Sequence, residues 1–107
     1  ASDGLMIRGL KAEPMAPGQM RFQLLVMQSG KDPAPFSGRY ELSLGGTMAA
    51  KAWATPPAAM VRGDMKLTQY ARSEGSIQYP AEAVVKTVQV RLLDARGTVR
   101  ATQVLRL

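Results

Sequence analysis

The sequence predicts an all-β domain: an antiparallel sandwich of seven or eight strands, immunoglobulin-like, or alternatively a small barrel. Two observations lead to this prediction. Apolar and polar residues alternate with a period of two in several short segments, as in strands with one buried face. Glycine- and proline-rich turns separate these segments about every 10–12 residues, and no segment has a convincing helical period.

The clearest strands form a hairpin over residues 84–107. Its first arm alternates strictly between Val88 and Leu92, and its second arm, residues 98–107, places most of its apolar side chains on one face. Residues 94–97 (Asp-Ala-Arg-Gly) connect the arms and are typical of a type I turn that ends in a glycine with positive φ. We therefore expect this hairpin to supply two core strands.

The rest of the chain divides into weaker strands. In residues 19–28, alternate apolar side chains, from Met20 to Val26, share one face. Further strands are predicted over residues 4–13, 37–45, 47–55, 65–72 and 76–79. Tight turns are predicted at Gly45-Gly46 and Glu74-Gly75, and a loop over residues 58–64. Apolar and polar residues alternate only weakly over residues 4–13, which predicts an edge strand.

Composition argues against catalysis. The 107 residues form one domain (1–107) without cysteine or histidine, which excludes disulfides, thiolate zinc sites and histidine-based triads. No phosphate-binding loop, dinucleotide fingerprint or nucleophile elbow is present. The acids considered for a carboxylate pair are Asp32, Glu41, Asp64, Glu74, Glu82 and Asp94. Four of them fall in predicted turns, where solvation explains them. We expect no enzyme, no cofactor and no metal site.

The charge suggests a binding surface. The formal net charge is +6, and the terminal hairpin contributes much of it. Arg91, Arg100 and Arg106 are predicted to form a basic face that binds an anionic partner, although a merely solvated face explains the same pattern. A nucleic-acid-binding β module is the alternative function. It is less expected, because aromatic residues are only 6% of the chain and Phe22 and Tyr40 fall on inward faces.

Two stretches carry a resemblance to a known family. They are residues 36–46 (FSGRYELSLGG) and residues 67–80 (LTQYARSEGSIQYP), the latter followed by residues 88–92 (VQVRL). In this order and spacing they resemble the C-terminal domain of a family of proteobacterial inner-membrane proteins to which no activity is assigned. Family members have a short cytoplasmic tail, one transmembrane helix, a coiled coil and a β domain outside the cytoplasm.

The resemblance implies a location and an architecture. The chain would be the C-terminal part of a longer envelope protein, on the periplasmic side of the inner membrane and anchored by an N-terminal helix that this chain lacks. A coiled coil in the missing part would make the protein a homo-oligomer. The expected function is a non-catalytic interaction or structural domain for an unidentified envelope protein or cell-wall polymer. Binding would use the basic face or an edge strand, for which residues 4–13 are the candidate.

Overall fold

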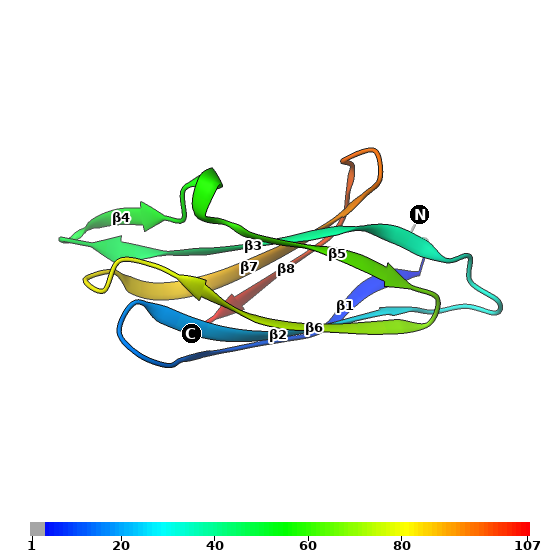
Figure 1. Cartoon of the computed structure of the whole chain (residues 1–107), viewed down its shortest axis with the longest axis horizontal. Coiled ribbons are helices and arrows are strands. Elements are labelled where there is room, and N and C mark those ends of the chain that lie inside the picture. Colours follow the sequence, from blue (N-terminus) through cyan, green and yellow to red (C-terminus); the bar gives the residue numbers. More distant parts are fainter. Residues whose placement is uncertain (1–3) are drawn as a thin grey trace.

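The computed structural model describes residues 4–107; residues 1–3 of the predicted domain lie outside this description. In the described part, eight strands and one short 3₁₀ turn follow one another along the chain (Figure 1). They are β1 (Leu5–Pro14), β2 (Gln19–Gln28), β3 (Phe36–Met48), β4 (Lys51–Ala54), η1 (Pro57–Ala59), β5 (Val61–Leu67), β6 (Tyr70–Gln78), β7 (Val84–Asp94) and β8 (Val99–Arg106). No described segment forms a helix with the length and apolar character needed to cross a membrane.

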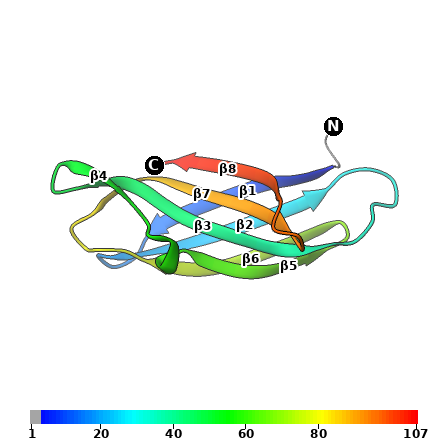
Figure 2. The ribbon, with the colours of Figure 1, turned by 90° about the horizontal axis from the view of Figure 1, so that it is seen from above.

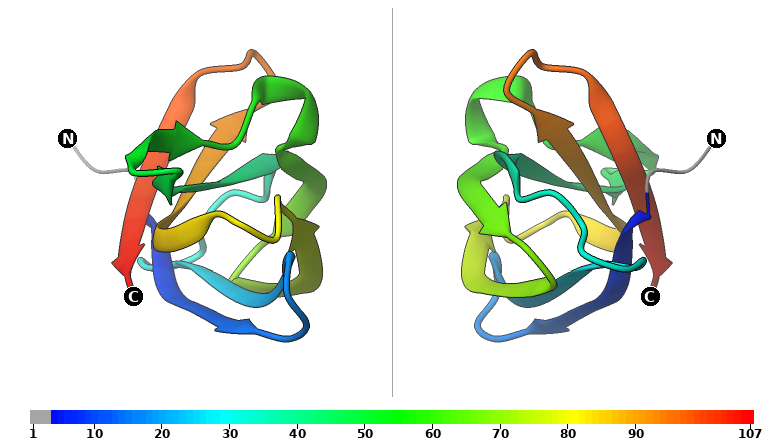
Figure 3. Two further views of the ribbon diagram at one scale, coloured as in Figure 1. Left: turned by 90° about the vertical axis from the view of Figure 1, so that its left-hand side faces the viewer. Right: turned by 90° about the vertical axis from the view of Figure 1, so that its right-hand side faces the viewer.

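The strands form two antiparallel sheets that pack face to face (Figures 2 and 3). The smaller sheet has the order β1-β2-β6. In the larger sheet, β3 pairs with β7 along one edge and with β4 and β5 along the other, and β8 continues the sheet beyond β7. The predicted sandwich is therefore confirmed. The sheets do not join into a closed barrel, so the sandwich keeps open edges.

The core lies between the two sheets and is built from the alternating positions that the sequence shows. Strand β2 contributes Met20, Phe22, Leu24 and Val26, all essentially inaccessible to solvent. The facing residues from β3 and β7 are Tyr40, Leu42, Leu44, Val88, Val90 and Leu92. An edge-to-face contact between the rings of Phe22 and Tyr40, with centroids 6.1 Å apart, joins the two layers.

Gly45-Gly46 does not form the predicted turn. Both glycines lie inside β3, and the chain reverses instead at Ala49 and Ala50, whose φ angles are 52° and 64°. Strand β7 passes so close to Gly46 that a Cβ there would lie 1.9 Å from the carbonyl oxygen of Val84. The glycine pair therefore allows close strand approach, which composition alone does not distinguish from a turn.

Residues 58–79 contain more strand than the sequence predicts. The predicted loop over residues 58–64 contains most of β5, and the predicted turn at Glu74-Gly75 lies within the nine-residue strand β6. Both segments are poor in strand-favouring residues, but long partners hold them in extended form. Strand β5 pairs with β3 along its whole length, and Gly75 pairs with Phe22 of β2. The prediction of a single strand over residues 65–72 is therefore wrong, because the chain turns between Leu67 and Tyr70.

Strand β1 is an edge strand, as predicted, but its inward face differs from the simple alternation. The register to β2 shifts between Ile7 and Gly9. Leu5 and Leu10 have opposite parity along the strand, so simple alternation would place them on opposite faces, but this β-bulge brings both into the core.

We predict that Gly38→Ala destabilises the fold. A Cβ at Gly38 would lie 2.1 Å from the carbonyl oxygen of Leu93 and 2.8 Å from the ring of Phe36, so β3 and β7 would have to separate. We expect a loss of about 1–3 kcal/mol in the free energy of unfolding, measured by urea denaturation. Gly9→Ala is the matched control, because its Cβ would meet only an ordinary contact of 3.8 Å. Equal stabilities of the two variants would contradict this account.

Candidate functional site

The hairpin that carries the predicted basic residues is fixed by Asp94 at its turn. One carboxylate oxygen of Asp94 accepts hydrogen bonds from the backbone N–H groups of Arg96 (2.9 Å) and Thr98 (3.0 Å). The N–H of Gly97, at φ 83°, donates to the carbonyl of Asp94. This confirms the predicted turn and starts β8 in a defined register beside β7.

The register shows which backbone groups of β8 lie at an open edge. The N–H of Leu107 donates to the carbonyl of Lys86. Hydrogen-bonded pairs alternate along an antiparallel ladder, so Leu105, Gln103 and Ala101 also bond to β7. The intervening residues, Thr102, Val104 and Arg106, direct their N–H and C=O groups away from β7. Among the described strands, β8 pairs with β7 alone.

The side chains at this edge are unusually apolar for an exposed strand. Val104 is 48% exposed and Leu107 is 55% exposed. The end of β8 passes close to β1 (Figure 3). In this region an open groove of about 430 Å³ lies between β1 and the C-terminal end of β8. Its apolar lining comes from Leu10 and Ala12 of β1 and from Leu105 and Leu107. Lys11, Glu13, Arg21 and Gln23 complete it. We call this groove, together with the open backbone of β8, the β8 edge site.

The edge that faces β8 across the sandwich, on β1, is blunted. The hydrogen bond from Met15 N–H to the carbonyl of Gln19 continues the ladder that pairs Glu13 with Arg21 and Lys11 with Gln23. By the same alternation, Ala12 and Pro14 face the open edge. Pro14 has no N–H to offer there, and the bulge after Ile7 interrupts the strand further along. Strand β8 therefore has the more complete free edge over residues 101–107.

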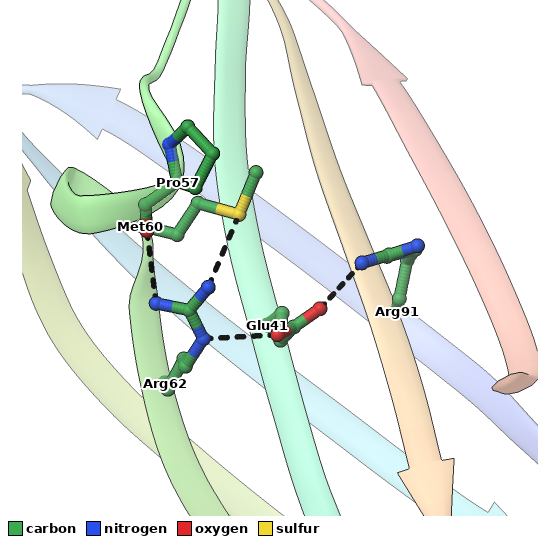
Figure 4. A network of polar contacts seen from close by, with 5 residues as sticks. All are labelled: Glu41, Pro57, Met60, Arg62 and Arg91. Carbon is green, nitrogen blue, oxygen red and sulfur yellow. Dashed lines mark hydrogen bonds and ion pairs between the residues drawn. The ribbon is translucent and has the colours of Figure 1, made fainter. Parts of the chain in front are cut away.

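Arg91, one of the three residues of the predicted basic face, forms an ion pair with an acid of the same domain. On the outer face of the larger sheet, Glu41 of β3 accepts hydrogen bonds from Arg91 of β7 and from Arg62 of β5 (2.9 Å), as Figure 4 shows. Arg62 also donates to the carbonyl of Pro57 (3.0 Å) and contacts the sulfur of Met60. The hydrogen bonds from Arg62 and then Arg91 hold the pKa of Glu41 below its usual value. The network ties three strands together.

Arg100 and Arg106, the other two residues of the predicted basic face, lie near opposite ends of β8. Arg100 lies at the bulge where the pairing of β7 and β8 shifts; its guanidinium is 3.5 Å from Asp94 and 6.0 Å from the ring centre of Phe36. Arg106 lies opposite Thr87 at the β8 edge site, about 13 Å along the strand from the position opposite Arg91. Within residues 4–107, Arg106 has no ion-pair partner.

The positions of the acidic and aromatic side chains bear on two other kinds of site, a metal site and a surface for single-stranded nucleic acid. No cluster of three acidic residues that could hold a metal forms among residues 4–107. Phe22, Phe36 and Tyr40 are buried, and Trp53 and Tyr79 are partly buried. Tyr70, 64% exposed, is the most accessible aromatic of the described chain. A single exposed ring does not make the row of stacking surfaces that single-stranded nucleic acid binds.

Comparisons with known proteins define the fold. No protein-family model and no curated protein matches this chain. The crystal structure of Spo0M, a sporulation control protein from Bacillus subtilis, superposes with a TM-score of 0.60 at 13% identity. That match covers 97% of this chain and 48% of Spo0M, so the chain spans about half of its length. A GH3 β-glucosidase from Bifidobacterium adolescentis gives 0.52 at 12% identity, covering 96% of this chain and 17% of the glucosidase.

At such low identity, the likeness shows the fold alone. The chain is a two-sheet antiparallel β-sandwich domain. The resemblance to the inner-membrane family stays a prediction.

We predict that Glu41→Gln destabilises the fold by about 1 kcal/mol at pH 7, because it removes the charge that joins Arg62 and Arg91. Folding lowers the pKa of Glu41 below its ordinary 4.5. Its contribution is therefore present above pH 4.5 and is lost as the pH falls through the folded pKa. The difference in unfolding free energy between the two proteins, measured in urea from pH 3 to 7, should shrink below pH 4.5.

Glu82→Gln, a change at an exposed turn, is the control and should leave the stability nearly unchanged. A difference for Glu41→Gln that stays constant from pH 7 to pH 3 would contradict the ion-pair account.

Proposed function

We propose that this chain is a non-catalytic interaction domain of a bacterial envelope protein, and that it binds an extended segment of a partner protein as an added strand along β8. One observation carries the proposal: Thr102, Val104 and Arg106 present backbone donors and acceptors at an open edge, and the neighbouring Leu105 and Leu107 give an adjacent groove its apolar side. Strand addition uses such an edge for affinity and alternate side-chain positions for specificity.

The edge is favoured over the broad basic face as the binding surface. Arg91 shares the single negative charge of Glu41 with Arg62, and Arg100 is close to Asp94 and Phe36. Replacing either would also disturb the fold, so neither is a clean probe of binding. Arg106 belongs to the edge itself.

The resemblance supports the cellular setting that we propose. It implies a domain on the periplasmic side of the inner membrane, held there by an N-terminal helix and assembled as a homo-oligomer by a coiled coil. Strand addition requires the backbone amides of a peptide. We therefore propose an envelope protein, rather than a cell-wall polymer, as the partner.

Proline at Val104 tests the proposal. Val104→Pro removes one outward N–H from β8 and leaves the ladder to β7 intact, as edge strands tolerate. The protein would be crosslinked in the cells that produce it and then purified with its bound partners. We expect the partner to be lost from Val104→Pro, while thermal unfolding shows that the variant remains folded.

Ala52→Pro is the matched control, because it removes an outward N–H from the edge strand β4, which does not line the groove. We expect it to retain the partner. The reverse pattern, with loss from Ala52→Pro alone, would transfer the site to β4. Capture that both variants retain would refute strand addition.

Nucleic-acid binding predicts a different result. A single-stranded DNA oligonucleotide should show no measurable affinity at about 50 mM salt, where the attraction between phosphates and a basic protein is strong. Binding that weakens steeply as salt is added would favour the nucleic-acid module instead.

A further inference from the structure

Resting on the proposed strand addition, we propose that the segment bound at the β8 edge site is acidic and alternates apolar with acidic residues. This inference names the chemistry of the partner. Three features support it: the two faces that an added strand would present, the charge of the surrounding residues and the length of the open edge.

An added strand would meet two different environments. Successive side chains of a strand point to opposite faces. On one face they would lie beside Thr102, Val104 and Arg106, whose positions in the ladder place them on the outer face of the sheet with Arg91. On the other face they would lie over the groove, beside Leu105 and Leu107. The side chains of the ligand beside Arg106 should therefore be polar, and those that meet Leu105 and Leu107 should be apolar.

The charge of the site selects an acidic ligand. Arg106 and Lys11, one at the edge and one in the groove, have no ion-pair partner within residues 4–107. Arg21, also in the groove, is 3.4 Å from Glu74, in an exposed pair. Glu13 is the acid of the groove lining. With a net charge of +6 on the chain, an acidic segment is attracted and a basic one is repelled.

The same charge argues against a second copy of this chain as the occupant. Two β8 edges placed side by side would bring together two positively charged protomers. Each would also bring an Arg106 that no acid of residues 4–107 pairs, so the approach of a second copy is electrostatically unfavourable. An acidic partner segment removes that repulsion.

The length of the edge sets the length of the ligand. The regular part of the ladder runs from Ala101 to Leu107. At about 3.3 Å per residue, a segment of roughly seven residues spans it. A peptide of nine residues with blocked ends therefore covers the edge and avoids terminal charges.

The test uses defined peptides and this chain. The probe is a blocked nine-residue peptide of alternating valine and glutamate. One control replaces every glutamate with lysine, and a second keeps the composition but separates the valines from the glutamates in two blocks. Affinity is measured by fluorescence anisotropy, and amide exchange is followed by NMR. We expect the valine–glutamate peptide to bind at least about tenfold more tightly than either control.

Substitutions locate the site. Arg106→Gln should weaken binding of the valine–glutamate peptide about two- to fivefold, as expected for one cross-strand ion pair. Arg39→Gln is the matched control, because Arg39 is an exposed arginine of β3 and β7 separates it from β8. It should leave the affinity nearly unchanged. Val104→Pro should abolish binding, and the amides of Thr102, Val104 and Arg106 should become protected from exchange when the peptide binds.

The outcomes separate this inference from the proposed function. Equal affinity for the glutamate and lysine peptides would overturn the acidic ligand and leave strand addition standing. Equal affinity for the block peptide would overturn the alternating pattern. Partner capture that depends on Val104, with no peptide bound, would overturn the inference and not the function. Val104-dependent self-association, seen by analytical ultracentrifugation without peptide, would show that the occupant is a second copy.

Discussion

Two apolar stripes that face each other across the sandwich hold the other features of this domain in place. One stripe runs along β2, and the other runs along β3 and β7 in the opposite sheet. Because side chains alternate along a strand, burying one stripe determines which face of each strand is exposed. Glu41 consequently lies on the outer face next to Leu42, where Arg62 and Arg91 compensate its charge. The outward direction of Thr102, Val104 and Arg106 follows from the same register.

A sandwich, unlike a closed barrel, has open sheet edges. In this domain the edge strands β1 and β8, which face each other across the sandwich, differ in structure. Strand β1 carries a bulge and Pro14 at an outward position, both of which discourage further pairing. Strand β8 has its bulge near the turn, at Arg100, and a regular ladder beyond it. An open apolar edge is an aggregation hazard unless it is used. The asymmetry between the edges is therefore the physical basis for assigning a binding role to β8.

Charge contributes to the fold and to the proposed binding in different ways. Glu41 is largely buried, and its two arginines, whose side chains are partly exposed, stabilise the pairing of β3 with its neighbours. Arg106 and Lys11 have no such partner among residues 4–107 and border the groove or its edge. A count of basic residues along the hairpin does not distinguish these two roles, because the distinction depends on which acid each arginine meets across the sheet.

The β class, the inward stripes of β2, β3 and β7, and the hairpin turn at Asp94 could be predicted from the sequence, because alternation and turn chemistry are local properties. The remaining features depend on contacts between strands that are distant in the chain. The requirement for glycine at position 46 arises from the close approach of β7, and β5 and β6 remain extended because long strands pair with them. The groove needed β1 beside β8. Bulges, edges and cross-strand ion pairs join residues that are far apart in the chain, and no local pattern records which strand becomes a neighbour.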